Sequence, residues 1–472
     1  MKLDNLKQNL LTKVSPSPLN MNLIKSKKTQ QIGQRIKSIN KLSLSKESEP
    51  KQLQIIGVTG SKGKSTTAYI IHQYLKSQGY RSILYSSIEI DSPTSYNAKG
   101  EAVENPLRDE RMLLDAIVQA EAYDADYLIL EVNERSIAKG YVKDIPFSIR
   151  LITNIIPTHN DDFYPPEEYV AIKKSFFEEI PETEDCVCIY GLEDKQIFES
   201  MSSLNNKPKK IFGSRYVAQK KGILEDKFDY LLYGRETPMD TIHGLDISFR
   251  INSKHERIES KMIMPYNAMN ILASIAVLDT LGIYKNDKFQ DMIRNFKVPG
   301  RDEKTEVRGR IIIVSSHLTP ELEIFKQYKD RKEIKNIKVV LGTSGEGYIT
   351  WVKEFSEDVH KREKERSLVF AYNYLKKYAD YVYITTTDIG ESDPKMLLNK
   401  QAGLLDKDTG YELEVDRKKA IRKAIIDSKE GDLIYISGRG NRRIMCDSRD
   451  TIKLHVDQEV VKDILDELKW LE

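Results

Sequence analysis

The chain has 472 residues, of which 40% are apolar and 31% are charged, and its formal net charge is +2. This length predicts two or three globular domains, and the near-neutral charge gives no sign of binding to nucleic acid or to a membrane surface. No apolar run approaches the length of a membrane span, and the N-terminus lacks the apolar segment of a secretion signal. Three cysteines, Cys186, Cys188 and Cys446, favour free thiols in a reducing cytoplasm over a disulfide framework or a metal site.

Residues 1–50 are basic, with ten Lys or Arg and three Asp or Glu, and contain one modest helical pattern at residues 24–42. We expect a short arm that packs on the following domain. The alternative is an arm that contacts an anion, but charged runs are mostly solvated surfaces. A segment of about 50 residues is too short to build a substrate domain of its own.

Residues 54–67 read Gln-Ile-Ile-Gly-Val-Thr-Gly-Ser-Lys-Gly-Lys-Ser-Thr-Thr and are followed by a helical pattern. This order predicts a strand, a phosphate-binding loop and a helix. Glycines allow several N–H groups to point at one anion, and the helix adds its positive N-terminus. In such a loop the lysine reaches the β- and γ-phosphates of a nucleotide and the serine hydroxyl binds Mg²⁺. The residues expected to bind ATP here are Gly60, Ser61, Gly63, Lys64, Ser65 and Thr66.

Strands and helices alternate through residues 51–297, the predicted nucleotide domain. The pattern predicts strands at 82–85, 127–132 and 149–156 and a helix at 111–122, and we expect a mostly parallel sheet with both faces covered. Ligand-binding residues of such sheets lie at the carboxyl ends of the strands. Glu131 ends its strand, where a carboxylate can hold the Mg²⁺ that bridges two phosphates. The alternative is an ordinary solvated or helix-capping glutamate.

The form Gly-x-Thr-Gly-x-x-Gly-Lys-Ser-Thr-Thr, with Val58 where common phosphate loops have a glycine, resembles the Mur ligase superfamily. That superfamily includes murein peptide ligases, folylpolyglutamate synthases and poly-glutamate or cyanophycin synthetases. Glu131 begins a partial match to the family's Glu-Val-Ser-Ser stretch, in which Asn133 and Glu134 replace the two serines. The short segment before the phosphate loop is more similar to the folyl- and poly-glutamate branches than to the murein ligases.

Two further stretches carry catalytic expectations that come from the resemblance. Residues 153–162 resemble Thr-Asn-x-x-x-Asp-His-Leu-Asp, which implies that His159 ligates a second Mg²⁺. Residues 169–177 resemble Tyr-x-x-Ala-Lys-x-x-Leu-Phe, whose lysine is carbamylated in the family. The ungapped match places this lysine at Lys173, and the neighbouring Lys174 is the alternative position. The alternative to carbamylation is an ordinary, unmodified lysine on the helix surface. Together with Lys64, His159 and Lys173 are the expected catalytic residues.

Residues 185–260 read as β-rich and irregular and carry no recognised chemistry. The apolar helix that begins near residue 265 resembles the family's His-Asn-x-x-Asn stretch, which implies that Asn267 contacts the adenine. An amide side chain both donates and accepts hydrogen bonds, which suits the edge of a base. The alternative is that this asparagine caps the helix. Residues 298–303 resemble the Gly-Arg-x-Glu hinge of the family, which implies that Arg301 reaches the nucleotide when the domains close.

Residues 298–472 alternate strands and helices again, which predicts a second Rossmann-like, doubly wound domain that binds the acceptor. The expected fold is therefore α/β: a P-loop-type, mostly parallel nucleotide domain, then this second domain, preceded by the short arm. Residues 379–385, 415–421 and 431–442 resemble the branch that adds the third residue of the murein peptide. The last of these stretches implies acceptor binding by Arg439, Asn441 and Arg442.

The chain departs from that branch in the stretches that bind substrates. Ser315 stands where the family has an aspartate, the Asp-Asn-Pro-Arg motif is replaced by residues 388–391, and Arg442 replaces a glutamate that would hold an ammonium group. Paired arginines and glycine-rich loops suit a carboxylate or phosphate better than an amine. The departures indicate a changed acceptor or a lost activity.

The resemblance implies an ATP-dependent carboxylate–amine ligase of the cytoplasm. ATP phosphorylates an acid with the help of Lys64 and one or two Mg²⁺ ions, and an amine attacks the acyl phosphate to form an amide. The first expectation is an amino acid or peptide ligase whose acid substrate carries no UDP or is bound differently. The second is a murein-type wall-precursor ligase in which a partner or residues 1–50 hold the nucleotide portion of the substrate. An ATP-binding regulatory protein without ligase activity and a simple phosphotransferase are the alternatives. Its partners would be small-molecule acids and amines, while a partner protein or a homo-oligomer stays open.

Overall fold

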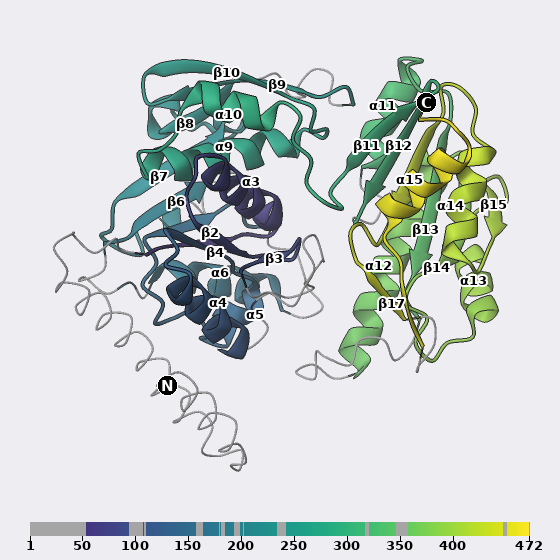
Figure 1. Ribbon diagram of the computed structural model, residues 1–472, viewed down its shortest axis with the longest axis horizontal. Helices are drawn as coiled ribbons and strands as arrows, with labels where there is room; N and C mark the ends of the chain where they lie inside the picture. Colours follow the sequence, from purple (N-terminus) through teal and green to yellow (C-terminus); the bar gives the residue numbers. More distant parts are fainter. Residues whose placement is uncertain are drawn as a thin grey trace, which may run out of the picture.

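The computed structural model describes residues 53–93, 107, 110–156, 164–178, 180, 185–192, 199–201, 203–233, 242–316, 321–345, 357–446 and 451–471. These residues form two α/β halves that lie side by side (Figure 1). The predicted arm at residues 1–50 and the predicted magnesium ligand His159 lie outside the described residues.

The first half is built on a ten-stranded sheet in the order β10-β9-β8-β7-β6-β5-β1-β4-β2-β3. Its strands are β1 (Gln54–Thr59), β2 (Ser82–Tyr85), β3 (Ile90–Asp91), β4 (Tyr127–Glu131), β5 (Ile149–Ile152), β6 (Val187–Gly191), β7 (Lys209–Ser214), β8 (Tyr230–Tyr233), β9 (Leu245–Ile251) and β10 (Lys254–Ser260). The strands from β8 through β2 in this order are parallel, and antiparallel strands extend the sheet at both edges. The stretch interpreted as β-rich and irregular, residues 185–260, contributes β6 to β10 to this sheet, so the expected β content is confirmed.

Helices cover both faces of this sheet because its central strands alternate apolar side chains between the two faces. Ile56 and Val58 of β1 pack on one face, and Ile55 packs on the other. The helices are α3 (Lys64–Ser77), α4 (Glu110–Ala122), α5 (Glu134–Ala138), α6 (Pro166–Glu178), α8 (Arg215–Lys221), α9 (Tyr266–Thr280) and α10 (Asn286–Ile293), with a short 3₁₀ turn at Glu225–Lys227. Helices α3 and α9 share one face, and α4 and α6 share the opposite face (Figure 1).

The second half has a six-stranded sheet in the order β11-β12-β16-β13-β14-β15, in which only β11 is antiparallel to its neighbour. Its elements are β11 (Glu303–Val307), β12 (Arg310–Ser315), α11 (Leu322–Asp330), β13 (Ile337–Thr343), α12 (Glu357–Tyr378), β14 (Tyr381–Thr386), α13 (Pro394–Ala402), β15 (Gly410–Leu413), α14 (Arg417–Ile426), β16 (Leu433–Ser437), the β17 (Ile444–Cys446) and β18 (Ile452–Leu454) hairpin, and α15 (Asp457–Glu467). The predicted α/β class with large, mostly parallel sheets is confirmed. Among the described helices, none is long and apolar enough to cross a membrane.

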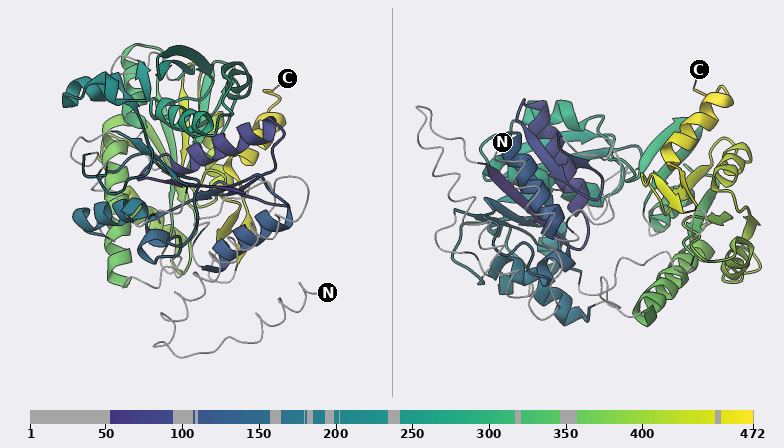
Figure 2. Two further views of the ribbon diagram at one scale, coloured as in Figure 1. Left: turned by 90° about the vertical axis from the view of Figure 1, so that its left-hand side faces the viewer. Right: turned by 60° about the horizontal axis from the view of Figure 1, so that its bottom comes forward.

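The two halves are distinct bodies in the right-hand view of Figure 2, yet the core cluster of the second sheet and its helices includes three buried residues of the first half: Ile263, Met264 and Ile242. Ile242 precedes β9. Its N–H donates to the Tyr328 hydroxyl at 3.1 Å, and its carbonyl accepts from Lys304 Nζ at 2.7 Å. The halves are therefore attached to each other at a point far in sequence from the chain that links them.

A buried ion pair ties α14 to α15 in the second half. The Arg417 guanidinium donates to both carboxylate oxygens of Asp457, at 2.8 and 2.7 Å, and neither side chain has any exposed surface. His455 Nε2 lies 2.9 Å from the same carboxylate. Burial alone raises the pKa of Asp457, but the charge and hydrogen bonds of Arg417 and the contact with His455 hold this pKa well below its usual range.

We expect the substitution Asp457→Asn to destabilise the second half by about 3–5 kcal/mol, because it leaves the Arg417 charge buried without its partner. Urea unfolding followed by a probe in the second half measures this loss. Glu467→Gln is the matched control, since Glu467 pairs with Arg422 between the same two helices but on the surface, and it should cost at most about 1 kcal/mol. Equal losses in both variants would contradict the prediction.

The same pair predicts a pH dependence of stability. Because the folded pKa of Asp457 lies below its unfolded value, the pair stabilises the fold fully above the unfolded pKa of about 4 and loses this contribution as the pH falls below it. The unfolding free energy of the wild type should therefore fall faster than that of Asp457→Asn as the pH is lowered from 5 to 3 (roughly the window in which the unfolded carboxyl titrates).

Candidate active site

The phosphate loop lies between the end of β1 and the start of α3, and two of its glycines have positive φ angles: Gly60 at 141° and Gly63 at 83°. A Cβ atom on Gly60 would lie 2.0 Å from Thr153 Oγ1, and one on Gly63 would lie 2.1 Å from Asn270 Oδ1. Both positions therefore require glycine for conformation and for space. The loop is enclosed by the end of β5 and by α9, which fixes its shape.

We expect Gly63→Ala to weaken nucleotide binding by at least roughly tenfold, because the side chain must strain the backbone and displace Asn270. Isothermal titration with ADP and Mg²⁺ measures the change. Gly79→Ala is the matched control: Gly79 follows the other end of α3 with a φ of 84°, but no atom of the described residues lies within 4 Å of the point that its Cβ would occupy. That variant should lose about 1 kcal/mol of stability and bind ADP normally. Normal ADP binding by Gly63→Ala would refute the expectation.

The polar side chains of the loop point to different partners. Lys64 Nζ donates to the carbonyl of Gly60 at 2.8 Å and to that of Ser61 at 3.3 Å, so its ammonium lies over the loop. Thr66 lies buried in the first turn of α3. The Ser61 hydroxyl instead contacts the Tyr169 hydroxyl at 3.0 Å and accepts from the N–H of Ile156 at 2.8 Å. The side chain of Ser61, which was predicted to bind the nucleotide, thus stabilises the loop through its contacts with Tyr169 and Ile156.

Three cations gather beside the loop. Desolvation of the Lys62 ammonium lowers its pKa, Glu321 raises it, and Lys64 and Arg301 lie close enough to lower it further. Such a cluster suits an anion with several charges, such as a polyphosphate. Lys62 was not predicted, although its place two residues before Lys64 was a usable signal.

Ser65 and Glu131, predicted separately to bind Mg²⁺, are in direct contact. Ser65 Oγ donates to Glu131 Oε1 at 2.9 Å, and Ser86 Oγ and the N–H of Ser87 donate to Oε2 at 2.8 and 2.7 Å. The Ser87 hydroxyl lies 2.8 Å from Ser65 Oγ. These oxygen donors fit Mg²⁺, which prefers carboxylate and hydroxyl oxygens. Ser86 and Ser87 were missed; they follow β2, which pairs with β4 beside Glu131.

Lys173 projects from α6 toward the same region and is fully buried. Its Nζ lies 3.2 Å from Thr59 Oγ1 and 3.4 Å from Glu134 Oε2. Burial, partly offset by Glu134, lowers its pKa to about 8. Lys174, the neighbouring alternative, is only half-buried, so Lys173 is the lysine that faces the site.

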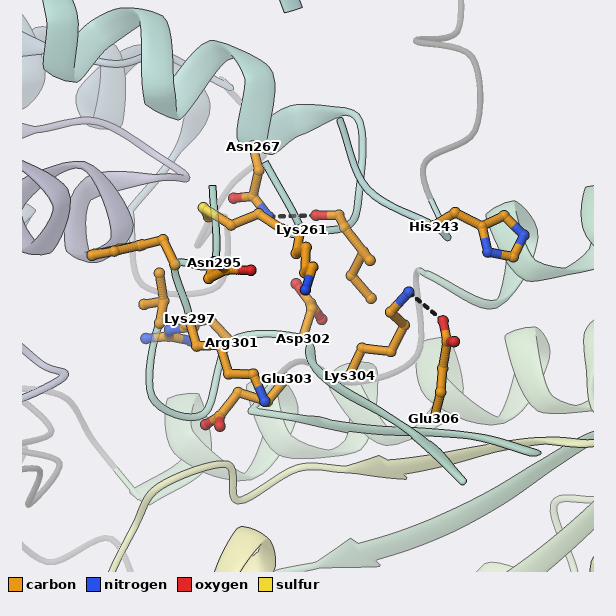
Figure 3. Close-up of a pocket in the computed structure, with 14 residues that line it drawn as sticks. His243, Lys261, Asn267, Asn295, Lys297, Arg301, Asp302, Glu303, Lys304 and Glu306 are labelled. Carbon is orange, nitrogen blue, oxygen red and sulfur yellow. Dashed lines mark hydrogen bonds and ion pairs between the residues drawn. The ribbon is translucent and has the colours of Figure 1, made fainter. Parts of the chain in front are cut away.

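A cavity of about 490 Å³ opens beside the hinge and is lined by Asn267 and Arg301. Figure 3 shows their side chains among the polar groups from residues 261–267 and 295–306 that surround this space. Asn267 is held in place because its Nδ2 donates to the carbonyl of Ile263 at 2.6 Å and its Oδ1 accepts from Asn270 Nδ2 at 2.9 Å. The two residues predicted to contact the nucleotide thus share a cavity whose volume suits a nucleoside.

Arg301 joins the two halves at the hinge, where Gly300 has a φ of 68°. Its NH2 group lies 3.4 Å from Ser87 Oγ in the first half, and its NH1 group donates to Ser316 Oγ in the second. Because Ser87 also contacts Glu131, Arg301 links the hinge to the candidate metal-binding group. Its contact with the nucleotide stays a prediction.

The three predicted acceptor residues have different environments. Arg439 has no exposed surface, and its guanidinium donates to Asp388 Oδ2 at 2.9 Å and to the carbonyl of Ile444 at 2.7 Å. We therefore correct its assignment: Arg439 holds the loop in place and does not face an acceptor. Asn441 is buried and donates to the Ile88 carbonyl in the first half at 2.9 Å. Arg442 is half-buried and lies within electrostatic range of Arg301, which places it at the junction of the halves.

These features define a P-loop nucleotide-binding protein of two α/β domains. They are the enclosed phosphate loop, the Ser65–Glu131 contact, and the second α/β half, which Arg301 links to the first. A family profile described as the Mur ligase middle domain matches residues 58–278. The chain is 25% identical over 422 residues to the UDP-N-acetylmuramoyl-L-alanyl-D-glutamate–2,6-diaminopimelate ligase of Prochlorococcus marinus, a match that covers 88% of this chain and 77% of that relative. The resemblance of this chain to the Mur ligase superfamily, seen in its motifs, is confirmed by these matches.

Solved structures share the fold. The MurF ligase of Thermotoga maritima, solved in complex with ADP, has a TM-score of 0.54 at 18% identity, covering 92% of this chain and 83% of that one. Folylpolyglutamate synthase of Thermotoga maritima has a TM-score of 0.54 at 16% identity, covering 92% of this chain and 93% of that one. Both branches noted in the sequence, the murein ligases and the folylpolyglutamate synthases, thus have the same architecture as this chain.

Proposed function

We propose that the protein is an ATP-dependent ligase that joins a carboxylate to an amine through an acyl phosphate and releases ADP. The observation that carries this proposal is the contact between Ser65 and Glu131 beside Lys64, at the junction of the two domains. A site for the phosphates of ATP that opens toward a second domain suits a reaction between two further substrates. The names of the curated relatives, which are amino acid ligases, support the same class.

In this proposal the loop amides and Lys64 hold the β- and γ-phosphates, and the cavity beside Asn267 takes the nucleoside. Mg²⁺, held by Ser65 and Glu131, would neutralise phosphate charge. A carboxylate oxygen of the acid attacks the γ-phosphorus, and the bond to the β-phosphate oxygen breaks to release ADP. The amine then attacks the acyl carbon, loses a proton and expels phosphate. Lys64 and Arg301 stabilise the negative charge that moves between these groups.

Different observations suggest the identity of the acid and that of the amine. The relatives named as diaminopimelate ligases favour a murein-type peptide precursor as one candidate acid. For the amine, Arg442 lies at the domain junction, near Arg301. Arginine binds carboxylates through two parallel hydrogen bonds, so we propose an amino acid acceptor with a carboxylate, and without a second ammonium group, at that end.

The test is phosphate release from ATP and Mg²⁺ across a panel of acids and amino acids, with the coupled product identified by mass. We expect release that requires both an acid and an amine, and a product heavier than the acid by one amide-linked amine. Release that requires only one acceptor would identify a phosphotransferase. ADP or ATP binding without turnover under any acceptor would identify a regulatory protein that has lost the ligase reaction.

A further inference from the structure

We propose that Lys173 acts as an unmodified ammonium and that the carboxylate of Glu134 supplies the negative charge that a lysine carbamate supplies elsewhere in the superfamily. The inference rests on the proposed nucleotide site. It concerns the chemical state of one side chain, so it is tested separately from ligase activity.

The first observation is the contact itself. Glu134 Oε2 lies 3.4 Å from Lys173 Nζ, which has no exposed surface, while the Glu134 side chain is 13% exposed. Nζ also contacts Thr59 Oγ1 and lies 5.4 Å from the centre of the Tyr169 ring. A carbamate would add a carbon and two oxygen atoms at Nζ. Those atoms would enter a space that is already bordered by the Glu134 carboxylate.

The second observation is the local charge. Among the described residues, the charged groups that shift the pKa of Lys173 are Glu134, Lys64 and Glu131. With Lys173 as an ammonium, the four charges sum to zero. Carbamylation replaces the positive charge of Lys173 by a negative one, which would place three anions around a single lysine. Like charges in a buried site disfavour one another's ionised forms, so the Glu134 carboxylate opposes a carbamate and favours the ammonium.

The third observation is how the chain places Glu134. It is the first residue of α5, and Asn133 caps this helix by accepting the N–H of Ser136 at 2.9 Å. Asn133 and Glu134 are the two positions at which the chain departs from the Glu-Val-Ser-Ser stretch of the family. The first departure fixes the helix start, and the second directs a carboxylate to Lys173. A carboxylate encoded by the sequence at this point makes the modification unnecessary.

The experiment is ¹³C NMR of the full chain with ¹³C-bicarbonate, together with intact mass measured under conditions that preserve carbamates. We expect no carbamate signal from the wild type and a signal from Glu134→Ser, which restores the residue of the family. Glu134→Gln, which keeps the shape and removes the charge, should also gain the signal and serves if the serine variant folds poorly. Lys174→Ala in the Glu134→Ser background should keep the signal, and Lys173→Arg in that background should lose it.

A carbamate signal from the wild type that disappears in Lys173→Arg would overturn the proposal. So would the absence of a signal from both Glu134 variants, because Glu134 would then not be the group that excludes the carbamate. None of these NMR or mass measurements requires that the protein catalyse the ligase reaction. Failure of the ligase assay would reject the proposed function and leave the NMR result interpretable.

Discussion

Replacing Lys64 by alanine is expected to lower amine-dependent phosphate release by at least about 10²–10³-fold, because one preorganised positive charge at the transferred phosphoryl group is lost. The fold should be retained, since within the described part of the chain Lys64 Nζ donates only to carbonyls of its own loop. Phosphate release at saturating ATP measures the effect, and circular dichroism and thermal unfolding check the fold.

The control for Lys64→Ala is Lys288→Ala, which removes an equal charge from an exposed position of α10. It should leave turnover unchanged. If Lys64→Ala kept the turnover of the wild type, residues 60–66 would not be the site of phosphoryl transfer, and the mechanism proposed for this chain would be wrong.

Glu131→Gln is expected to reduce turnover by about 10²-fold or more and to raise the Mg²⁺ concentration needed for half-maximal rate, because it removes the negative charge from the Ser65–Glu131 group. The amide is close in shape to the carboxylate, and its oxygen can still accept from Ser65 or Ser86. The effect should therefore lie in metal binding more than in stability. A Mg²⁺ titration of the rate, with Mn²⁺ binding followed by electron paramagnetic resonance, separates the two.

Glu168→Gln is the matched control, because Glu168 is exposed in the first turn of α6. It should change neither the rate nor the Mg²⁺ requirement. An unchanged Mg²⁺ requirement in Glu131→Gln would show that the metal, if used, is held by other residues.

The parts of the site that lie within one stretch of sequence were predictable. The phosphate loop is such a part, because its glycines, lysine and serine act through local backbone geometry and through the helix that follows them. Glu131 could be assigned for a related reason: a residue at the carboxyl end of a buried parallel strand lies at the edge where ligands bind. Alternation of apolar strands and helices was sufficient for the α/β class.

The contacts between distant segments were not predictable. Ser86 and Ser87 reach Glu131 only because β2 pairs with β4, and nothing in their own stretch shows this pairing. Arg439 was assigned to the acceptor from a motif, but burial against Asp388 decides its role. Glu134 looked like a simple departure from a motif until the structure placed it beside Lys173. In each case the partner comes from another element.

The anchoring of Ile242 in the second domain has a mechanical consequence. Ile263 and Met264 of the first domain lie in the same core cluster, and Asn441 donates to the Ile88 carbonyl across the junction. Rotation of one domain against the other would therefore withdraw apolar side chains from that core, at a cost of about 25 cal/mol for each Å² of apolar surface exposed to water. A ligand that separates the domains must supply this free energy from its own binding.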